Sequence, residues 1–163
     1  MEIFGGFDPA DASRRFFRPL RVAASGLTAQ RVRMETIAEN IANAEATRTA
    51  GGGAYQRQVA RLEARPRPDT GPLTLASLDV PPLPFQEGEP GGVDVTAVEA
   101  DPTEGPLVYD PGHPDADANG YVRYPNVELS QETVDLMLSR RAYEANATVF
   151  QVLKSVLHRA LSI

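Results

Sequence analysis

The segment 20–47 carries apolar and small residues spaced alternately three and four apart, with Gln30 in the one polar position. This spacing predicts an α-helix that packs lengthwise against another helix. Pro19 comes just before the run, where a helix tolerates proline. Each large apolar side chain contributes roughly 1.5–3 kcal/mol only when it is fully buried. The N-terminal helix is therefore expected to require a helical partner.

A second amphipathic segment, 130–163, has apolar residues at i, i+1, i+4, i+7 and i+8. This pattern predicts a helix whose apolar stripe is broad enough to contact more than one neighbour. The helix is itself one candidate partner for 20–47. We expect the two stripes to supply a subunit interface: Leu20, Ala23, Leu27, Gln30, Met34, Ile37, Asn40, Ile41, Asn43, Leu138, Ala142, Ala145, Val149, Phe150, Leu153, Val156, Leu157 and Leu161.

Asn40 and Asn43 are unusual members of that set, because asparagine is a poor helix former unless its amide is bonded. One interpretation is a fraying C-terminal turn of the helix. The other is a pair of polar contacts to a neighbouring subunit that fixes the register of a helical seam.

The middle of the chain differs from both ends in charge and composition. From Pro68 to Val122 there are eleven acidic residues and no Lys or Arg, and twelve of the fourteen prolines lie between Pro66 and Pro125. Short alternating segments at 55–64, 93–98, 107–109 and 121–124 are strand candidates. We therefore predict an α+β protein: an N-terminal arm (1–19), a helical core (20–47 and 130–163) forming a coiled-coil-like layer, and a small irregular β-rich domain (48–129) with a Pro-rich loop at 66–92.

Several classes of protein are disfavoured by composition. The formal net charge of -6 and a pI near 4.9 argue against a nucleic-acid partner. No run approaches the roughly eighteen apolar residues of a membrane span. The N-terminus lacks the continuous apolar core of a cleavable secretory signal. The sequence has no cysteine, which excludes disulfides, thiolate metal sites and a Cys nucleophile.

The loop 110–126 resembles half of a calcium-binding loop. Asp115, Asp117, Asn119 and Gly120 match the first, third, fifth and sixth positions of an EF-hand. The last position, which requires a bidentate Glu, is Asn126. A calcium-regulated binding module is the alternative function, and a polar loop rich in turns is the simpler interpretation.

Catalytic patterns are sparse. His113 stands near acidic residues, so an acid–base role in a small hydrolase is conceivable, but no nucleophile elbow or second metal-ligand His accompanies it. Arg31, Arg33, Arg140 and Arg141 could form a basic strip, although a solvated or ion-paired helix face is the commoner explanation. We expect no enzyme activity, no cofactor and no small-molecule substrate.

Four stretches resemble bacterial flagellar rod and hook proteins, and among them the proximal rod proteins. The first holds Ser25-Gly26-Leu27-Thr28-Ala29-Gln30 with Asn40-Ile41-Ala42-Asn43. The others are Tyr55-Gln56-Arg57-Gln58, the run 107–122 (LVYDPGHPDADANGYV) and Ser139-Arg140-Arg141-Ala142-Tyr143-Glu144-Ala145-Asn146. The run 107–122 is the discriminating one.

The resemblance implies a structural subunit that assembles helically through its terminal helices, lines an export channel and transmits torque in the periplasmic rod of the basal body. It implies export without a cleaved signal peptide, through the flagellar export apparatus. The implied partners are further copies of the chain, the rod proteins FlgB, FlgF and FlgG, the adaptor FliE and the MS-ring protein FliF.

Overall fold

Two long helices and two short β-ribbons make up the computed structural model, which describes residues 9–65 and 91–162, without the side chains of 9–16 and 161. Helix α1 spans Pro9–Ala42 and α2 spans Leu129–Leu161. Between them come β1 (Gln58–Ala64), β2 (Val93–Ala100), β3 (Leu107–Tyr109) and β4 (Tyr121–Arg123). The prediction of an α+β fold with long terminal helices and a small β-rich middle is confirmed.

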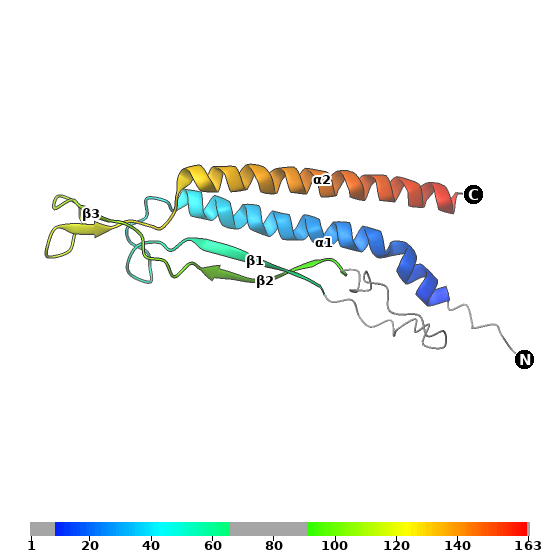
Figure 1. Cartoon of the computed structure of the whole chain (residues 1–163), viewed down its shortest axis with the longest axis horizontal. Helices are drawn as coiled ribbons and strands as arrows, with labels where there is room; N and C mark the ends of the chain where they lie inside the picture. The colour runs from blue at the N-terminus through cyan, green and yellow to red at the C-terminus, as the bar shows by residue number, and fades with distance from the viewer. Residues whose placement is uncertain (1–8, 66–90, 163) are drawn as a thin grey trace, which may run out of the picture.

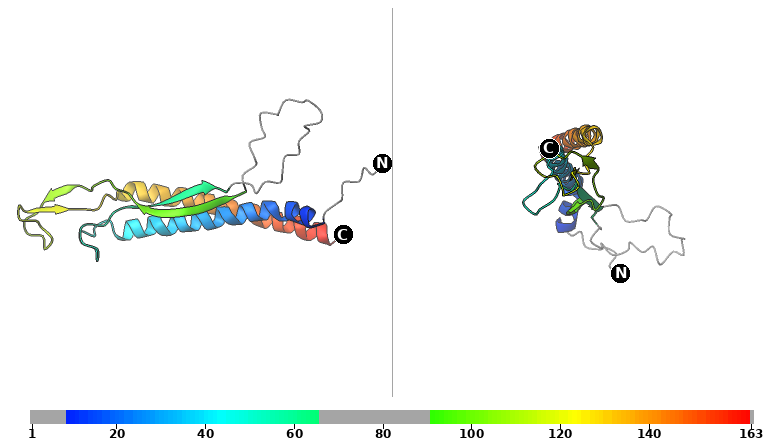
Figure 2. Two further views of the ribbon diagram at one scale, coloured as in Figure 1. Left: turned by 90° about the horizontal axis from the view of Figure 1, so that it is seen from below. Right: turned by 90° about the vertical axis from the view of Figure 1, so that its left-hand side faces the viewer.

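The layers are simple. Helices α1 and α2 run antiparallel along the long axis, and α1 lies between α2 and the β1–β2 ribbon (Figure 1). Strands β1 and β2 pair antiparallel from Gln58↔Ala100 to Ala64↔Val93, with an irregularity at Arg61/Leu62. Strands β3 and β4 form a separate ribbon that projects beyond the helices (Figures 1 and 2). That ribbon lies at the opposite end from the start of α1 and the end of α2.

Helix α1 begins earlier and ends earlier than its sequence pattern predicts. It starts at Pro9, inside the predicted arm 1–19, and continues through Pro19. Proline fits the first helical position, and within a helix it bends the axis without always ending it; α1 is bent in its N-terminal part (Figure 1). Residues 1–8 of the predicted arm, and 66–90 of the predicted Pro-rich loop, lie outside the described residues.

The C-terminal end of α1 is set by Asn43. Its backbone N–H donates to the Glu39 carbonyl (3.1 Å), and its side-chain Nδ2 donates to the same oxygen (2.8 Å). A side chain that bonds a last-turn carbonyl competes with continuation of the helix. The helix therefore ends at Ala42, five residues before the predicted end at 47.

The two helices meet along an inner seam of unusually small and polar residues. A Cβ on Gly26 would lie 2.8 Å from Asn146 Nδ2, so the helices approach closely there. On α2, buried or half-buried residues recur every three or four positions at Glu132, Leu136, Ser139, Tyr143, Asn146, Phe150, Leu153 and Leu157. Two seam atoms, Gln30 Oε1 and Ser139 Oγ, are buried without a hydrogen-bond partner.

Little apolar side-chain area is fully buried in a single chain. Among the described residues the buried hydrophobic ones are Ala23, Ala29, Ile37 and Val122. In the described part of the chain, fourteen large hydrophobic residues are exposed, six of them between residues 134 and 156 of α2. Monomeric soluble proteins rarely leave a large contiguous apolar patch exposed to water. The monomer is thus incompletely packed on the side of α2 that faces away from α1.

Candidate functional site

The outer face of α2 is the most prominent apolar surface in the described part of the chain. We define it by Val134, Leu138, Ala145, Val149, Val152 and Val156. Its five large side chains are 51–56% exposed. The residues recur at helical spacing and lie on one side of the helix, away from the seam residues Ser139 and Phe150. A single α1 cannot cover both faces, so the outer face is available to another protein.

The broad stripe predicted for 130–163 therefore divides into two faces. Phe150, Leu153 and Leu157 are half-buried on the inner seam, while Leu138, Val149 and Val156 are exposed on the outer face. The other predicted interface residues fall as follows: Ala23, Ile37 and Asn40 are buried; Leu20, Leu27, Gln30, Met34, Ile41, Asn43 and Ala142 are half-buried; Ala145 is exposed; the Leu161 side chain is outside the described set.

Asn40 is fully used within its own chain. Its Nδ2 donates to the Gln58 carbonyl (2.9 Å) and to Glu132 Oε2 (3.1 Å). Its Oδ1 accepts from the Gln58 N–H (2.8 Å) and the Tyr55 hydroxyl (3.0 Å). A primary amide has two donor hydrogens and two acceptor positions, so all four are satisfied. With 1% of its surface exposed, Asn40 has nothing left for the predicted contact with a neighbouring subunit.

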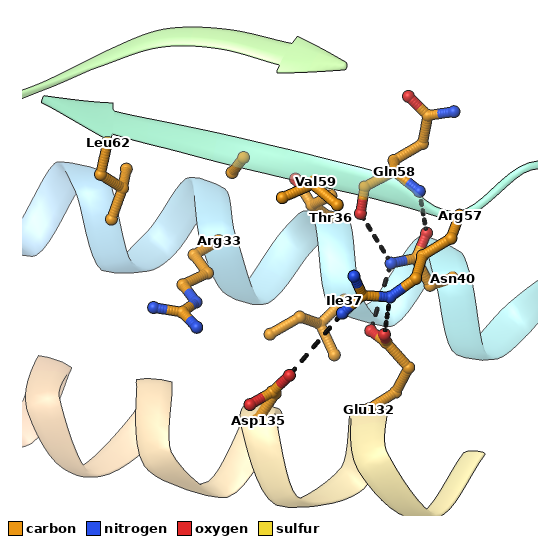
Figure 3. A pocket seen from close by; sticks show the side chains of 11 residues that line it. Arg33, Thr36, Ile37, Asn40, Arg57, Gln58, Val59, Leu62, Glu132 and Asp135 are labelled. Carbon is orange, nitrogen blue, oxygen red and sulfur yellow. Dashed lines mark hydrogen bonds and ion pairs between the residues drawn. The ribbon is translucent and has the colours of Figure 1, made fainter. Parts of the chain in front are cut away.

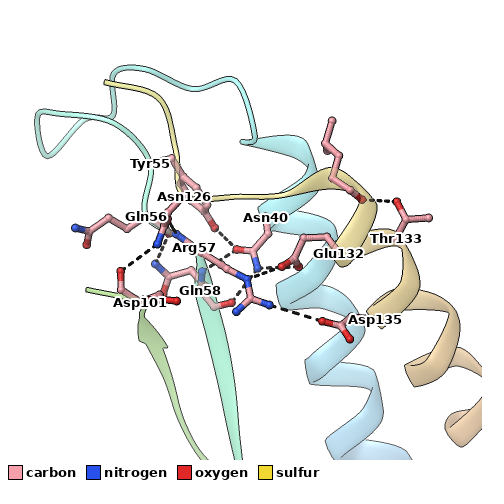
Figure 4. Close-up of polar contacts among 11 residues, drawn as sticks. Asn40, Tyr55, Gln56, Arg57, Gln58, Asp101, Asn126, Glu132, Thr133 and Asp135 are labelled. Carbon is pink, nitrogen blue, oxygen red and sulfur yellow. Dashed lines mark hydrogen bonds and ion pairs between the residues drawn. The ribbon is translucent and has the colours of Figure 1, made fainter. Parts of the chain in front are cut away.

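These bonds belong to a polar junction that we define by Asn40, Tyr55, Arg57, Gln58, Asn126 and Glu132 (Figure 4). Glu132 is 0% exposed, and its Oε1 accepts from Arg57 Nε at 2.5 Å. The Arg57 guanidinium also lies 3.7 Å from Asp135 Oδ2, and its backbone N–H donates to Asn126 Oδ1 at 2.7 Å. The junction joins α1, the start of β1, the segment before α2, and α2 itself.

A shallow groove beside the polar junction is lined by α1, β1 and α2 (Figure 3). Arg33, Thr36 and Ile37 come from α1, and Asp135 comes from α2. Its lining holds no His and no Cys, and its buried carboxylate, Glu132, is already paired with Arg57. The Thr36 hydroxyl donates to the Val32 carbonyl, and Asp135, like Glu132, lies beside Arg57.

Asp115 and Asp117, two of the predicted calcium ligands, already have partners within the chain. Asp115 Oδ2 accepts from the Thr47 hydroxyl at 2.8 Å, and Arg48 lies 3.5 Å from its other oxygen. Asp117 Oδ1 accepts the N–H groups of Asn119 (2.8 Å) and Tyr121 (2.9 Å), as turn-forming aspartates do. No group of three metal-ligating side chains occurs in residues 9–65 and 91–162. The calcium alternative has no support in this geometry.

Local structure accounts for His113 and for two of the four candidate arginines. His113 Nδ1 accepts from the Asp115 N–H at 3.1 Å, as part of the same turn. Arg31 pairs with Glu35 and Arg140 with Glu144, each one helical turn away on an exposed face. Such pairs contribute little to stability.

Within the described ranges, no helix is both long and apolar enough to cross a membrane.

Sequence reasoning did not single out Arg57, Tyr55 and Glu132. Arg57 and Glu132 are 75 positions apart in the chain, so no local periodicity connects them. Arg57 and Tyr55 do belong to the run Tyr55-Gln56-Arg57-Gln58 that supported the family resemblance. That run was the available signal, but it carried no information about the buried partner.

Tyr55 gives the polar junction a dependence on alkaline pH. Burial raises the pKa of its hydroxyl, and the nearby Glu39 and Glu132 carboxylates raise it further. Because folding favours the protonated form, its stabilisation is complete below the ordinary tyrosine pKa of about 10 and is lost as pH rises through the elevated value. We expect the free energy of unfolding of Tyr55→Phe, measured with urea, to decline less steeply above about pH 10 than that of the wild type. An equally steep decline in both proteins would contradict this assignment.

Two segments of the chain, one near each end, match family models of flagellar rod proteins. One matching family model is described as flagella basal body rod protein, over residues 20–48. Another is described as flagellar basal body rod FlgEFG protein C-terminal, over residues 118–163. These two segments hold most of α1, and β4 together with α2, so they carry both the inner seam and the outer face.

Similar proteins include three called flagellar basal-body rod protein FlgC. The protein of Borreliella burgdorferi is 43% identical over 155 residues, 90% of this chain and 96% of the relative. That of Bacillus subtilis is 38% identical over 151 residues, with 90% and 97% covered. That of Aquifex aeolicus is 36% identical over 144 residues, with 88% and 92% covered.

Proposed function

The chain belongs to the family of the flagellar basal-body rod protein FlgC, and from this membership we propose that the outer face of α2 is the surface through which it assembles. A FlgC-type protein is a structural subunit of the rod in the flagellar basal body, where it assembles with other rod components. The single observation that carries the proposal is the row of exposed valines and leucine between residues 134 and 156.

The fold leaves the outer face of α2 as apolar surface that a partner can bury. Helix α1 already contacts α2 on one side and the β1–β2 ribbon on the other, so its own apolar stripe is occupied within the chain. The outer face of α2 has no such cover. Burying apolar surface contributes roughly 25 cal/mol per Å², and five large side chains that are each about half exposed supply such surface on one side of α2. A neighbouring helix laid along the part from Val134 to Val149 would bury that part lengthwise.

We also propose that the subunit transmits torque, and the polar junction suits this role. A subunit that transmits torque has to hold its β-ribbons at a fixed angle to its helices. Asn40 and the Arg57–Glu132 pair tie α1, α2 and β1 together with directional bonds rather than with a deformable apolar contact. We propose that this tie keeps the subunit rigid while the outer face joins it to its neighbours.

The remaining features of the proposal rest on family membership. They are contacts with the rod proteins FlgB, FlgF and FlgG, the adaptor FliE and the ring protein FliF, and delivery by the flagellar export apparatus. They also include a position in the periplasmic rod, where the helices line the export channel. A non-enzymatic role likewise rests on family membership.

The proposal is tested by incorporation into the rod. Cells that lack their own copy of the gene would be supplied with a tagged copy of the chain, and basal bodies would be purified. We expect the tag in the rod, and swimming restored together with hook formation. Complete rods and normal swimming in cells that have no copy at all would contradict the proposal.

A further inference from the structure

The β3–β4 ribbon ends in an exposed aromatic surface that the contacts within the chain leave uncovered. Leu107, Tyr109 and Tyr121 are 56%, 64% and 44% exposed. Leu107 lies opposite Arg123 and Tyr109 opposite Tyr121, so these side chains share one face of the ribbon. On the other face Val122 is 1% exposed and Val108 is 44% exposed. The two tyrosine rings stack edge to face with centroids 5.2 Å apart. A two-stranded ribbon of this size is marginally stable alone, and a partner on its open face would stabilise it.

Two carboxylates border this aromatic surface. Asp110 follows β3 directly, and Oδ1 of Asp110 accepts from the Gly112 N–H. Asp117 uses its own Oδ1 in the turn that leads into β4. Neither forms an ion pair with any residue that the structure describes. We define the hairpin tip as Leu107, Tyr109 and Tyr121 with Asp110 and Asp117.

The C-terminal part of α2 has the complementary composition. Its outer face continues through Val152 and Val156, which are 55% and 56% exposed. Arg159 follows Val156 by three positions and Val152 by seven, so it lies on the same side of the helix. It is exposed and has no ion pair in the described part of the chain. From Ala145 to Ile163 the sequence contains Lys154 and Arg159 but no acidic residue.

These two surfaces lie at opposite ends of an elongated molecule (Figures 1 and 2). In an axial assembly whose subunits all point the same way, the projecting end of one subunit meets the opposite end of the next. Such head-to-tail contact uses two different patches, as open helical assemblies do. The acidic aromatic tip would then be brought to the basic, valine-lined end of α2.

We propose that the hairpin tip of one subunit docks on the C-terminal part of the outer face of α2 in a second copy of the chain. Leu107, Tyr109 and Tyr121 cover Val152 and Val156, and the carboxylates of Asp110 and Asp117 pair with Arg159. The proposal rests on the assembly into the rod proposed above, and it adds which patch of one subunit meets which patch of the next.

The test uses the natural lack of cysteine. Chains that carry Tyr109→Cys are mixed with differently tagged chains that carry Val156→Cys, and a short bismaleimide is added. We expect crosslinked pairs that contain both tags. The matched control replaces Val156→Cys by Gln151→Cys, an exposed position on the same helix away from the outer face. A mixed-pair yield no higher than that of the control overturns the proposal.

The charge contribution is tested in the same assay. Asp110→Asn combined with Asp117→Asn keeps the turn-forming oxygens but removes both charges. We expect the mixed-pair yield to fall about threefold, which is the effect expected for the loss of an exposed ion pair. For the wild-type tip, the yield should fall when the salt concentration is raised. Arg159→Glu should have the same effect. A yield that is insensitive to all of these changes overturns the pairing with Arg159.

The two proposals fail in different ways. If the chain enters the rod but Tyr109→Cys and Val156→Cys never crosslink above the control, the tip contact is wrong and the assembly function stands. If the chain never enters the rod, the assembly function fails, whatever the crosslinking result is.

Discussion

Leu138→Asp and Val149→Asp, each made alone, are expected to keep the chain out of purified basal bodies while the soluble chain still folds. Both side chains are more than half exposed in the single chain, so aspartate is solvated there and the cost in stability should be about 1 kcal/mol or less. In the assembled rod the same aspartate would be buried against a neighbour. An isolated charge moved from water into an apolar contact costs far more than one half-buried valine contributes.

The measurement is the amount of tagged chain in basal bodies from cells that lack their own copy, with swimming as a second readout. Gln151→Asp is the matched control, since it places the same charge at an exposed position of α2 outside the outer face. We expect it to incorporate normally. Normal incorporation of both Leu138→Asp and Val149→Asp would contradict the role of the outer face in assembly. Urea unfolding of the purified variants would show whether a loss of incorporation merely reflects misfolding.

Arg57→Ala is expected to lower the free energy of unfolding by about 3–5 kcal/mol, because it leaves the fully buried Glu132 carboxylate without its counter-charge. Arg61, in the adjoining strand β1, provides the control. Arg61 pairs with Glu99 at 2.9 Å, but both side chains are more than half exposed. An exposed pair contributes about 0–1 kcal/mol, so Arg61→Ala should be almost neutral.

Urea unfolding followed by circular dichroism would measure both effects. Arg57→Ala should lower the free energy of unfolding much more than Arg61→Ala does. Similar losses for Arg57→Ala and Arg61→Ala would mean that the polar junction does not hold the subunit together. Pairing Arg57→Ala with Glu132→Leu supplies a further check, because removing the buried charge as well should restore part of the lost stability.

Local patterns predicted the elements well where the period was long and uninterrupted. The three- and four-residue spacing in 20–41 and the apolar recurrence in 138–157 both fall within observed helices, and the alternation at 93–98 falls within β2. Pro19 misled the prediction of where α1 begins, because a proline before a periodic run usually indicates a helix start. In α1 it lies inside the helix, at some cost in straightness.

The division of α2 into two faces could not be predicted from its sequence. Val149 and Phe150 are adjacent and equally apolar, yet one is on the outer face and the other on the inner seam. Only the position of α1 decides which is which, and that position is set by contacts such as Gly26 with Asn146. The polar junction was hidden for a related reason, because Asn40, Arg57 and Glu132 are brought together by the fold and not by spacing in the chain.

The most direct test of the account is the accessibility of a single cysteine at position 138, before and after assembly. In the soluble chain, Leu138→Cys should react with a maleimide about as fast as Gln151→Cys, since both positions are exposed. In purified basal bodies, Leu138→Cys should be strongly protected, because the outer face of α2 is then covered by another subunit. A cysteine at position 138 that reacts as readily in the rod as in solution would contradict the claim that this face joins the subunits.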